Sequence, residues 1–199
     1  MFVTGLVLAA GSSSRLGQPK QLLPYRGTTL LEVTLGVARQ CHFDELLVTI
    51  GGAADEVSER VDFRDAVVVR NQQFGSGCSS SISAALQLVD PQSDGIVLML
   101  GDQPEISPDA IHRLVGAASD SPLAVCRYDD GRGHPFWFHR DVFADLAGLH
   151  GDKAVWKLLE SGRYDVAEVP VDGMIPLDVD TWDDYQALIS RTSVTTSAD

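Results

Sequence analysis

The sequence predicts a single-domain α/β protein, a three-layer sandwich with a mainly parallel sheet. Short runs rich in Val, Ile and Leu recur along the 199 residues, and segments of helical character separate them. The runs do not alternate with polar residues, which is typical of strands covered by helices on both faces. A chain of this length normally forms one domain. Alternating strands and helices then predict a parallel sheet between two helical layers.

Five strands are expected, at residues 3–9, 45–50, 66–70, 95–100 and 123–128. A helix should begin at Thr29, because Thr29 and Glu32 have the spacing of a capping box, in which both side chains bind free N–H groups of the first turn. Another should begin at Ser107-Pro108, since proline is tolerated in the first turn of a helix. We therefore expect a Rossmann-like arrangement, with ligands outside the carboxyl ends of the strands.

The pattern becomes less regular after residue 130. Phe136-Trp137-Phe138 predicts a strand in a small antiparallel excursion, and helices are expected at 140–148, 153–160 and 181–190. The folded domain should span residues 1–190. The Ser/Thr-rich tail at 191–199 is expected to be disordered.

Composition and charge exclude several classes of function. The formal net charge of −13 argues against nucleic-acid binding and against an anionic membrane surface, because both need a basic face. No segment approaches the roughly 20 apolar residues of a membrane span, and the start of the chain lacks the basic residues of a secretory signal. Three scattered cysteines, Cys41, Cys78 and Cys126, indicate reduced thiols. These features predict a cytoplasmic protein.

Residues 3–20 form the most informative segment. An apolar run stops at Gly11, Ser12–Ser14 follow, and Arg15 and Lys20 come next. Backbone N–H groups of such a loop and two cations can bind the phosphates of a nucleoside triphosphate at the end of a strand. The spacing is that of neither a P-loop nor a dinucleotide-binding fingerprint. An ordinary Gly/Ser turn is the alternative.

The spacing of this segment as a whole resembles the opening signature of the MobA/MocA-like nucleotidyltransferases. The matching residues are Leu8-Ala9-Ala10-Gly11, Ser14-Arg15-Leu16-Gly17, Pro19-Lys20 and Leu22-Leu23. Members of this family are molybdenum-cofactor guanylyl- and cytidylyltransferases, and the resemblance covers nearly the whole chain. It implies Mg²⁺-dependent transfer, with Mn²⁺ as a possible substitute, of a nucleotide to the terminal phosphate of molybdopterin, with release of pyrophosphate.

The resemblance also implies which residues form the site. Arg15, Lys20 and Asp102 would be catalytic. The nucleotide would be bound by Leu8, Ala9, Ala10, Gly11, Ser12, Ser13, Arg15, Lys20, Asn71, Gly77, Ser81 and Asp102.

Asp102 is the strongest candidate for a metal ligand. It follows a buried strand within Gly101-Asp102-Gln103-Pro104, where an aspartate is commonly only a turn former or a helix cap. Its expected place on the ligand rim and the preference of Mg²⁺ for carboxylate oxygens favour a metal role. The segment also resembles the family's Gly-Asp-x-Pro motif, whose aspartate holds magnesium.

Asp178 and Asp180 are further metal candidates. They are two residues apart, so in an extended segment both side chains point the same way. The family has a similar Asp-x-Asp-Thr element. Alternatively, Asp180 or Thr181 caps the helix that follows.

Two loops are expected to approach the substrates. Asn71, Phe74, Gly77 and Ser81 resemble a family element near the base and ribose, although a Ser-rich helix start would have the same sequence. Cys78 beside them is interpreted as a packed residue, not a nucleophile. Arg132 and His134, in a Gly-His-Pro segment, and Asp152, in a Gly-Asp-x-x-Ala segment, are implied to face the acceptor, and a plain turn is the alternative.

Ala9-Ala10-Gly11, Pro19-Lys20 and Gly101-Asp102-Gln103-Pro104 are closer to the cytidylyl branch of the family. CTP is therefore the expected nucleotide. GTP with the same acceptor, and a sugar- or alditol-phosphate acceptor, stay open. A non-catalytic protein that binds the cofactor and delivers it is the alternative from another class. A molybdoenzyme or its maturation chaperone would be the protein partner.

Overall fold

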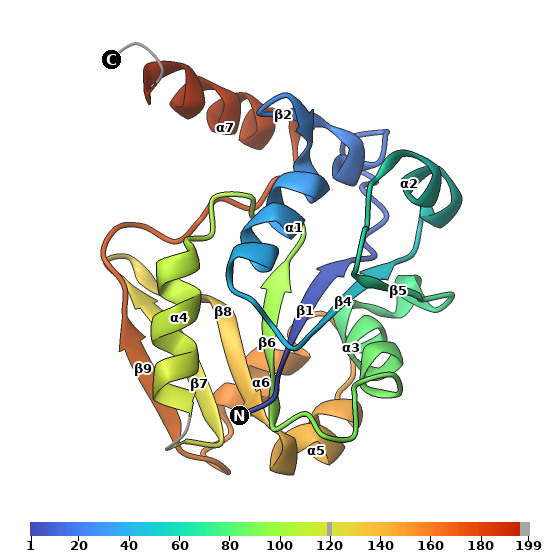
Figure 1. The fold of residues 1–199 in the computed structure, drawn as a ribbon. Coiled ribbons are helices and arrows are strands. Elements are labelled where there is room, and N and C mark those ends of the chain that lie inside the picture. Colours follow the sequence, from blue (N-terminus) through green and yellow to red (C-terminus); the bar gives the residue numbers. More distant parts are fainter. Residues whose placement is uncertain (119–120, 196–199) are drawn as a thin grey trace.

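The computed structural model describes residues 1–118 and 121–195. It has three layers, a central sheet with a layer of helices on each face (Figure 1). The seven strands are ordered β5-β4-β1-β6-β8-β7-β9. Their bounds are β1 (Val3–Ala9), β4 (Glu45–Ile50), β5 (Val67–Arg70), β6 (Gly95–Leu100), β7 (Leu123–Tyr128), β8 (Gly131–His139) and β9 (Val166–Pro170). The single-domain α/β sandwich predicted from the sequence is confirmed.

The sheet is mainly parallel. β1 pairs in parallel with β4 and β6, β4 with β5, and β7 with β9, whereas β8 runs antiparallel to both β6 and β7. The antiparallel excursion predicted around Phe136-Trp137-Phe138 is therefore strand β8, inside the main sheet. A separate two-stranded antiparallel sheet joins β2 (Pro24–Tyr25) to β3 (Thr28–Thr29).

Strand register brings the ends of three neighbouring strands to one edge. Ala9 pairs with Ile50, and Leu8 pairs with Leu100. The loops that follow β1, β4 and β6 consequently begin side by side. Gly101 lies where the backbones come close, since a Cβ there would be 2.8 Å from the Cβ of Ala9 and 3.1 Å from the carbonyl oxygen of Leu8.

Seven α-helices are described, and most of them cover the two faces of the sheet. Their bounds are α1 (Leu30–Gln40), α2 (Ala54–Arg60), α3 (Cys78–Leu86), α4 (Pro108–Ala117), α5 (Phe143–Ala147), α6 (Ala154–Glu160) and α7 (Trp182–Thr195). The capping box predicted at the start of α1 is present, because Thr29 accepts from the N–H of Glu32 and the Glu32 carboxylate accepts from the N–H of Thr29. Ser107 caps α4 with a single bond, its side chain accepting from the N–H of Asp109 at 3.2 Å.

Two apolar cores fill the spaces between the layers. One packs α1, α2 and α4 against the sheet and includes Leu35, Val57 and Leu114. The other packs α3, α5 and α6 against the opposite face and includes Ile82 and Leu158. A third, smaller cluster joins Leu16 of the loop after β1 to Val179 and Leu188 of the C-terminal segment.

The structure differs from the prediction in several elements. Helix α2, the β2–β3 hairpin and strand β9 were not predicted, and α3 corresponds to the Ser-rich helix start that the sequence offered as an alternative. The helix predicted at 140–148 is a 3₁₀ turn, Arg140–Val142, followed by α5. Helix α7 continues to Thr195, five residues into the tail expected to be disordered, because adding a residue to an existing helix gains a hydrogen bond. Residues 196–199 lie outside the described part of the chain.

Within the described ranges, no helix has the length and apolar character needed to cross a membrane.

Candidate active site

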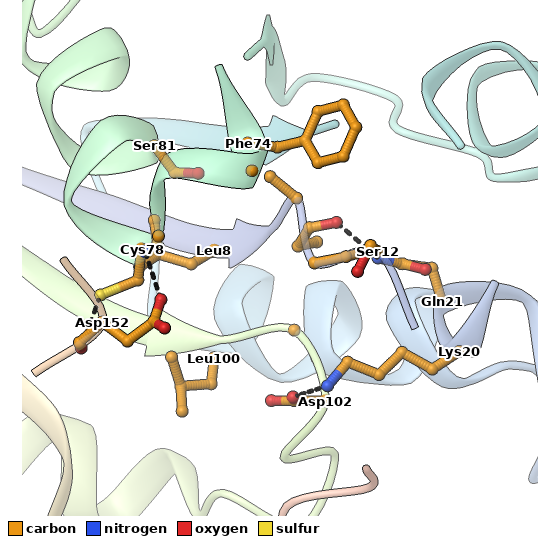
Figure 2. Close-up of a pocket in the computed structure, with 16 residues that line it drawn as sticks. Leu8, Ser12, Lys20, Gln21, Phe74, Cys78, Ser81, Leu100, Asp102 and Asp152 are labelled. Carbon is orange, nitrogen blue, oxygen red and sulfur yellow. Dashed lines mark hydrogen bonds and ion pairs between the residues drawn. The ribbon is translucent and has the colours of Figure 1, made fainter. Parts of the chain in front are cut away.

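A cavity of about 390 Å³ opens where β1 and β6 end (Figure 2). It is lined by Leu8, Ala9, Ala10, Gly11, Ser12, Lys20, Gln21, Phe74, Gly75, Gly77, Cys78, Ser81, Leu100, Gly101, Asp102 and Asp152. Nine of these residues were predicted to bind the nucleotide: Leu8, Ala9, Ala10, Gly11, Ser12, Lys20, Gly77, Ser81 and Asp102. The structure brings them together from three loops that are far apart in the sequence.

The loop after β1 is held by side chains of the turn that follows it. The amide Nε2 of Gln21 donates to the carbonyl oxygens of Ala9 and Gly11, at 2.6 and 3.2 Å. The N–H of Lys20 donates to Ser13 Oγ at 3.0 Å. Ser13 therefore supports the loop and does not line the cavity. Gly11 and Ser12 remain exposed at the cavity wall, as an anion-binding loop requires.

Lys20 lies between two carboxylates. Its ammonium group pairs with Asp102 and, at 2.7 Å, with Asp180. The side chains of Lys20 and Asp102 are only 14% and 17% exposed. Arg15, which is 64% exposed, pairs with the other oxygen of Asp180 at 2.7 Å. The two predicted cations thus converge on the predicted acidic residues, although Arg15 does not line the cavity.

The charges of this cluster shift one another's protonation. Burial would lower the pKa of Lys20, but Asp102 and Asp180 outweigh burial and raise it. Burial would raise the pKa of Asp180, but Lys20 and Arg15 lower it. Partial loss of contact with water and the negative charges of Asp102 and Asp180 raise the pKa of Asp178 to about 6. The site keeps Lys20 charged and gathers carboxylates beside it.

The residues present fit a divalent metal ion. Asp102 Oδ1 is buried and has no hydrogen-bond partner among the described residues. Asp102, Asp178 and Asp180 line one cavity, and carboxylate oxygens are the ligands that Mg²⁺ and Mn²⁺ prefer. The described ranges contain no group of three or more His, Cys, Asp or Glu already close enough to hold an ion. Lys20 Nζ lies between two of the candidates, so a metal ion and this ammonium share partners.

The alternative roles of the acidic residues are decided by their contacts. Thr181 caps α7, because its Oγ1 accepts from the N–H of Asp184 at 3.2 Å and its own N–H donates to the Asp184 carboxylate at 2.8 Å. Asp180 is left free of the capping role and binds the cations. Asp102 Oδ1 caps no helix either, since it has no described partner.

Asn71 supports the cavity wall from behind. Its Nδ2 donates to Ser80 Oγ at 2.8 Å and to Ser81 Oγ at 2.9 Å, and its Oδ1 accepts from the N–H of Gln73 at 2.8 Å. It is only 5% exposed and does not line the cavity. The structure therefore places Asn71 as a support for Ser81, and Ser81 at the cavity.

A second cavity of about 390 Å³ adjoins the first. Leu8, Cys78, Leu100, Asp102 and Asp152 line both, and the remaining wall of the second consists of Leu98, His134, Phe136, Val155, Trp156, Asp178 and Asp180. The Trp156 ring packs edge-on against Phe136 at 5.1 Å, and the His134 ring lies 4.0 Å from that of Phe136. None of the described residues that line this cavity is Lys or Arg.

His134 is uncharged at neutral pH. Burial lowers its pKa to about 3. His134 therefore contributes a neutral, polar edge beside Phe136 and Trp156, at the position where the sequence predicted an acceptor contact.

Asp152 joins the two cavities. Its Oδ1 accepts from the N–H of Cys78 at 3.2 Å, at the start of α3, as Figure 2 shows. Gly77 has a φ of 94°, which favours glycine, and a Cβ there would be 2.7 Å from the same oxygen. Burial and the charge of Asp152 raise the pKa of the Cys78 thiol, so it has little thiolate character. Cys78 is thus a packing residue, as the sequence indicated.

Arg132 is not brought to either cavity. Its guanidinium group, on β8, pairs across β7 with Glu168 of the edge strand β9, with Nε 2.8 Å from the carboxylate. The contact with β9 could not be foreseen because that strand was not predicted.

Several lining residues were not predicted. Gln21 directly follows Lys20, and its burial could have been inferred from the apolar residues after it. Phe74 was named only as part of the element expected near the base and ribose, and it lies at the first cavity near Ser81 (Figure 2). Phe136 and Trp156 looked like ordinary core residues, and only the tertiary structure shows that they border a cavity.

Sequence comparison finds one family and a varied set of relatives. The MobA-like NTP transferase domain family matches residues 5–168. Purine catabolism protein PucB of Bacillus subtilis (strain 168) is 30% identical over 200 residues, covering 92% of this chain and 94% of PucB. The nicotine blue oxidoreductase of Paenarthrobacter nicotinovorans is 34% identical over 67% of this chain and 69% of its own length. The molybdenum cofactor cytidylyltransferase of Escherichia coli (strain K12) is 28% identical over 90% of this chain and 92% of the enzyme.

Solved structures agree with the fold. Rv0371c of Mycobacterium tuberculosis H37Rv is 55% identical, with a TM-score of 0.90 over 94% of this chain and 97% of that one. A structure of Rv0371c in complex with manganese is 52% identical in the aligned part, with a TM-score of 0.86 over 96% of this chain and 99% of that one.

Proposed function

The chain belongs to the MobA-like NTP transferase domain family, and on that premise we propose that it transfers CMP from CTP to the terminal phosphate of molybdopterin. The observation that carries the proposal is Asp102, which lines both cavities and pairs with Lys20 of the phosphate-facing loop. Two substrates bound in adjoining cavities would meet at this carboxylate.

The proposed step is a displacement at the α-phosphorus. An oxygen of the acceptor phosphate forms a bond to it, the bond to the β-phosphate oxygen breaks, and pyrophosphate leaves with that electron pair. A phosphate acceptor is already ionised at neutral pH, so no strong general base is needed. Catalysis then depends on positioning and on neutralising negative charge. Backbone N–H groups at Gly11 and Ser12, together with the Lys20 ammonium, would stabilise the negative charge of the triphosphate.

Asp102, with Asp178 or Asp180, would hold the divalent ion. When bound, Mg²⁺ would neutralise charge between the two phosphates and polarise the α-phosphate. Mn²⁺ is an expected substitute, and the manganese complex of Rv0371c supports the use of a divalent ion by a close relative. The second cavity has four carboxylates and no Lys or Arg among its described lining residues. A phosphate approaching from that side would therefore depend on the metal ion for neutralisation.

The lining of the second cavity favours a planar, aromatic acceptor. Phe136, Trp156 and neutral His134 give it a wall suited to stacking against a ring system such as a pterin. A sugar- or alditol-phosphate would need hydrogen-bonding side chains where these rings lie. CTP is preferred to GTP because Ala10, in the resemblance to the cytidylyl branch, lines the first cavity. The cytidylyltransferase of E. coli is the relative whose name supports this choice.

Pyrophosphate release tests the proposal. The protein is incubated with Mg²⁺ and each of the four ribonucleoside triphosphates in turn, with and without molybdopterin. Release with CTP that requires molybdopterin is expected. Release with GTP alone would move the assignment to guanylyl transfer, and nucleotide binding without any release would favour a protein that binds and delivers the cofactor.

A further inference from the structure

We infer that Gln103 is a positioning residue, whose buried side-chain amide holds the segment of Asp178 and Asp180 against Asp102. The inference rests on the proposed function, since it concerns the metal ligands proposed there. Gln103 is 1% exposed and lines neither cavity. It touches no substrate space, so any effect on the reaction must act through the residues that it binds.

The Gln103 amide binds the backbone of this segment. Its Nε2 donates to the carbonyl oxygen of Pro176 at 3.0 Å. The same side chain is close enough to the Asp178 carboxylate to lower its pKa, although the opposing effects of lost contact with water and neighbouring negative charge are larger. The amide thus fixes the backbone two residues before Asp178 and lies beside its carboxylate.

The segment needs such support because it has little of its own. Residues 174–180 form neither helix nor strand, between β9 and α7. A second bond fixes the same stretch, from the N–H of Val179 to the carbonyl oxygen of Asp102 at 3.1 Å. Val179 is fully buried in the small cluster with Leu16 and Leu188. Asp102 and Gln103, which are consecutive in the loop after β6, therefore anchor the chain on the two sides of Asp178.

The chemistry requires an amide at this position. A glutamate could not donate to Pro176 when ionised and would repel Asp178. A methionine fills a similar volume but has no donor, and would leave the half-buried carbonyl oxygen of Pro176 without this partner. Groups that orient a metal ligand typically change metal affinity by about 10- to 100-fold when they are replaced.

The test is titration of the full chain with Mn²⁺ alone, followed by the electron paramagnetic resonance signal of free Mn²⁺. Gln103→Met should weaken Mn²⁺ binding by about 10- to 100-fold, and Asp178→Asn should change it in the same direction. Gln40→Met is the matched control, because Gln40 is exposed on α1 and bonds only to Gly36 of its own helix among the described residues. It should bind Mn²⁺ like the wild type. If Gln103→Met does not fold, Gln103→Asn keeps the amide but is too short to reach the carbonyl oxygen of Pro176, and should also weaken binding.

A second readout separates positioning from plain stability. With Gln103→Met, the Mg²⁺ concentration for half-maximal turnover should rise, excess Mg²⁺ should restore much of kcat, and KM for CTP should stay within about twofold of wild type. Unchanged Mn²⁺ affinity in folded Gln103→Met, while Asp102→Asn loses binding, would overturn the inference and leave the proposed function intact. Wild-type protein that binds no Mn²⁺ would overturn both.

Discussion

Lys20 and Asp102 form an ion pair in the wall of the first cavity, although 82 residues separate them in the chain. Both side chains are largely sheltered from water, and Asp180 completes the pair from the C-terminal segment. The ammonium that is expected to meet the triphosphate therefore serves first as counter-ion to the proposed metal ligands. Its removal should affect nucleotide and metal binding in opposite directions.

Lys20→Met is predicted to weaken CTP binding at least about tenfold, because a charge-assisted hydrogen bond to phosphate is lost. Mn²⁺ alone should bind the same variant more tightly, because no ammonium competes for Asp102 and Asp180. Isothermal titration calorimetry measures both affinities. Lys157→Met, an exposed position on α6, is the control and should change neither. A parallel loss of both affinities would indicate damage to the fold and contradict the prediction.

Asp102→Asn should reduce turnover by about 10³-fold or more, since several kcal/mol of charge stabilisation depend on the metal that this carboxylate would hold. Asparagine keeps the volume and can still accept from Lys20, so the thermal unfolding midpoint should change little. Pyrophosphate release and circular dichroism measure the two effects. Asp55→Asn, at a carboxylate that is 89% exposed, is the control. Activity close to wild type in Asp102→Asn would remove Asp102 from the metal site.

The pH dependence of stability should carry a contribution from His134. Its folded-state pKa is lowered to about 3, against 6.5 for an ordinary histidine. Between these values the unfolded chain binds the proton and the folded protein does not, so stability falls as the pH falls. Wild type should lose up to about 2 kcal/mol more unfolding free energy than His134→Phe between pH 7.5 and pH 5.

Urea denaturation at the two pH values measures that difference. His112→Gln, at an exposed position on α4, should behave like the wild type at both. Equal losses in wild type and His134→Phe would show that His134 is not held neutral by the fold.

Trp156→Ala should raise KM for molybdopterin about tenfold and leave KM for CTP within twofold, because Trp156 lines only the second of the two cavities. Loss of an aromatic contact of this kind is worth about 0.5–1.5 kcal/mol beyond the area that it buries. Steady-state kinetics with each substrate varied in turn measures both constants. Trp182→Ala, on the exposed start of α7, is the matched control. An equal rise in both KM values would contradict two separate cavities.

The predicted strands correspond closely to the observed ones because buried runs of Val, Ile and Leu have few alternatives. Strands β1, β4, β6 and β7 have the predicted bounds, and β5 begins one residue later than expected. Helix α2 was missed, since it is short and rich in charge, and the serine-rich start of α3 was predicted only as an alternative to a substrate-facing loop. Strand β9 was missed because it lies at the edge of the sheet, ends at Pro170 and lacks a continuous run of buried residues.

The site could be predicted where its residues directly follow strands. Gly11 and Asp102 lie at one edge because the register of β1 and β6 brings them there. The partners of Asn71 and Arg132 come from tertiary contacts that the local sequence does not encode. The same is true of Gln103, whose role depends on a segment more than 70 residues further along the chain.

Transfer of the α-phosphate itself tests the central claim most directly. The protein is incubated with Mg²⁺, molybdopterin and CTP labelled at the α-phosphate, and both labelled products and pyrophosphate are quantified. The account predicts label in the molybdopterin product, in an amount equal to the pyrophosphate released, and none with Asp102→Asn. Absence of labelled acceptor and of pyrophosphate, with CTP and with every other nucleoside triphosphate, would contradict it.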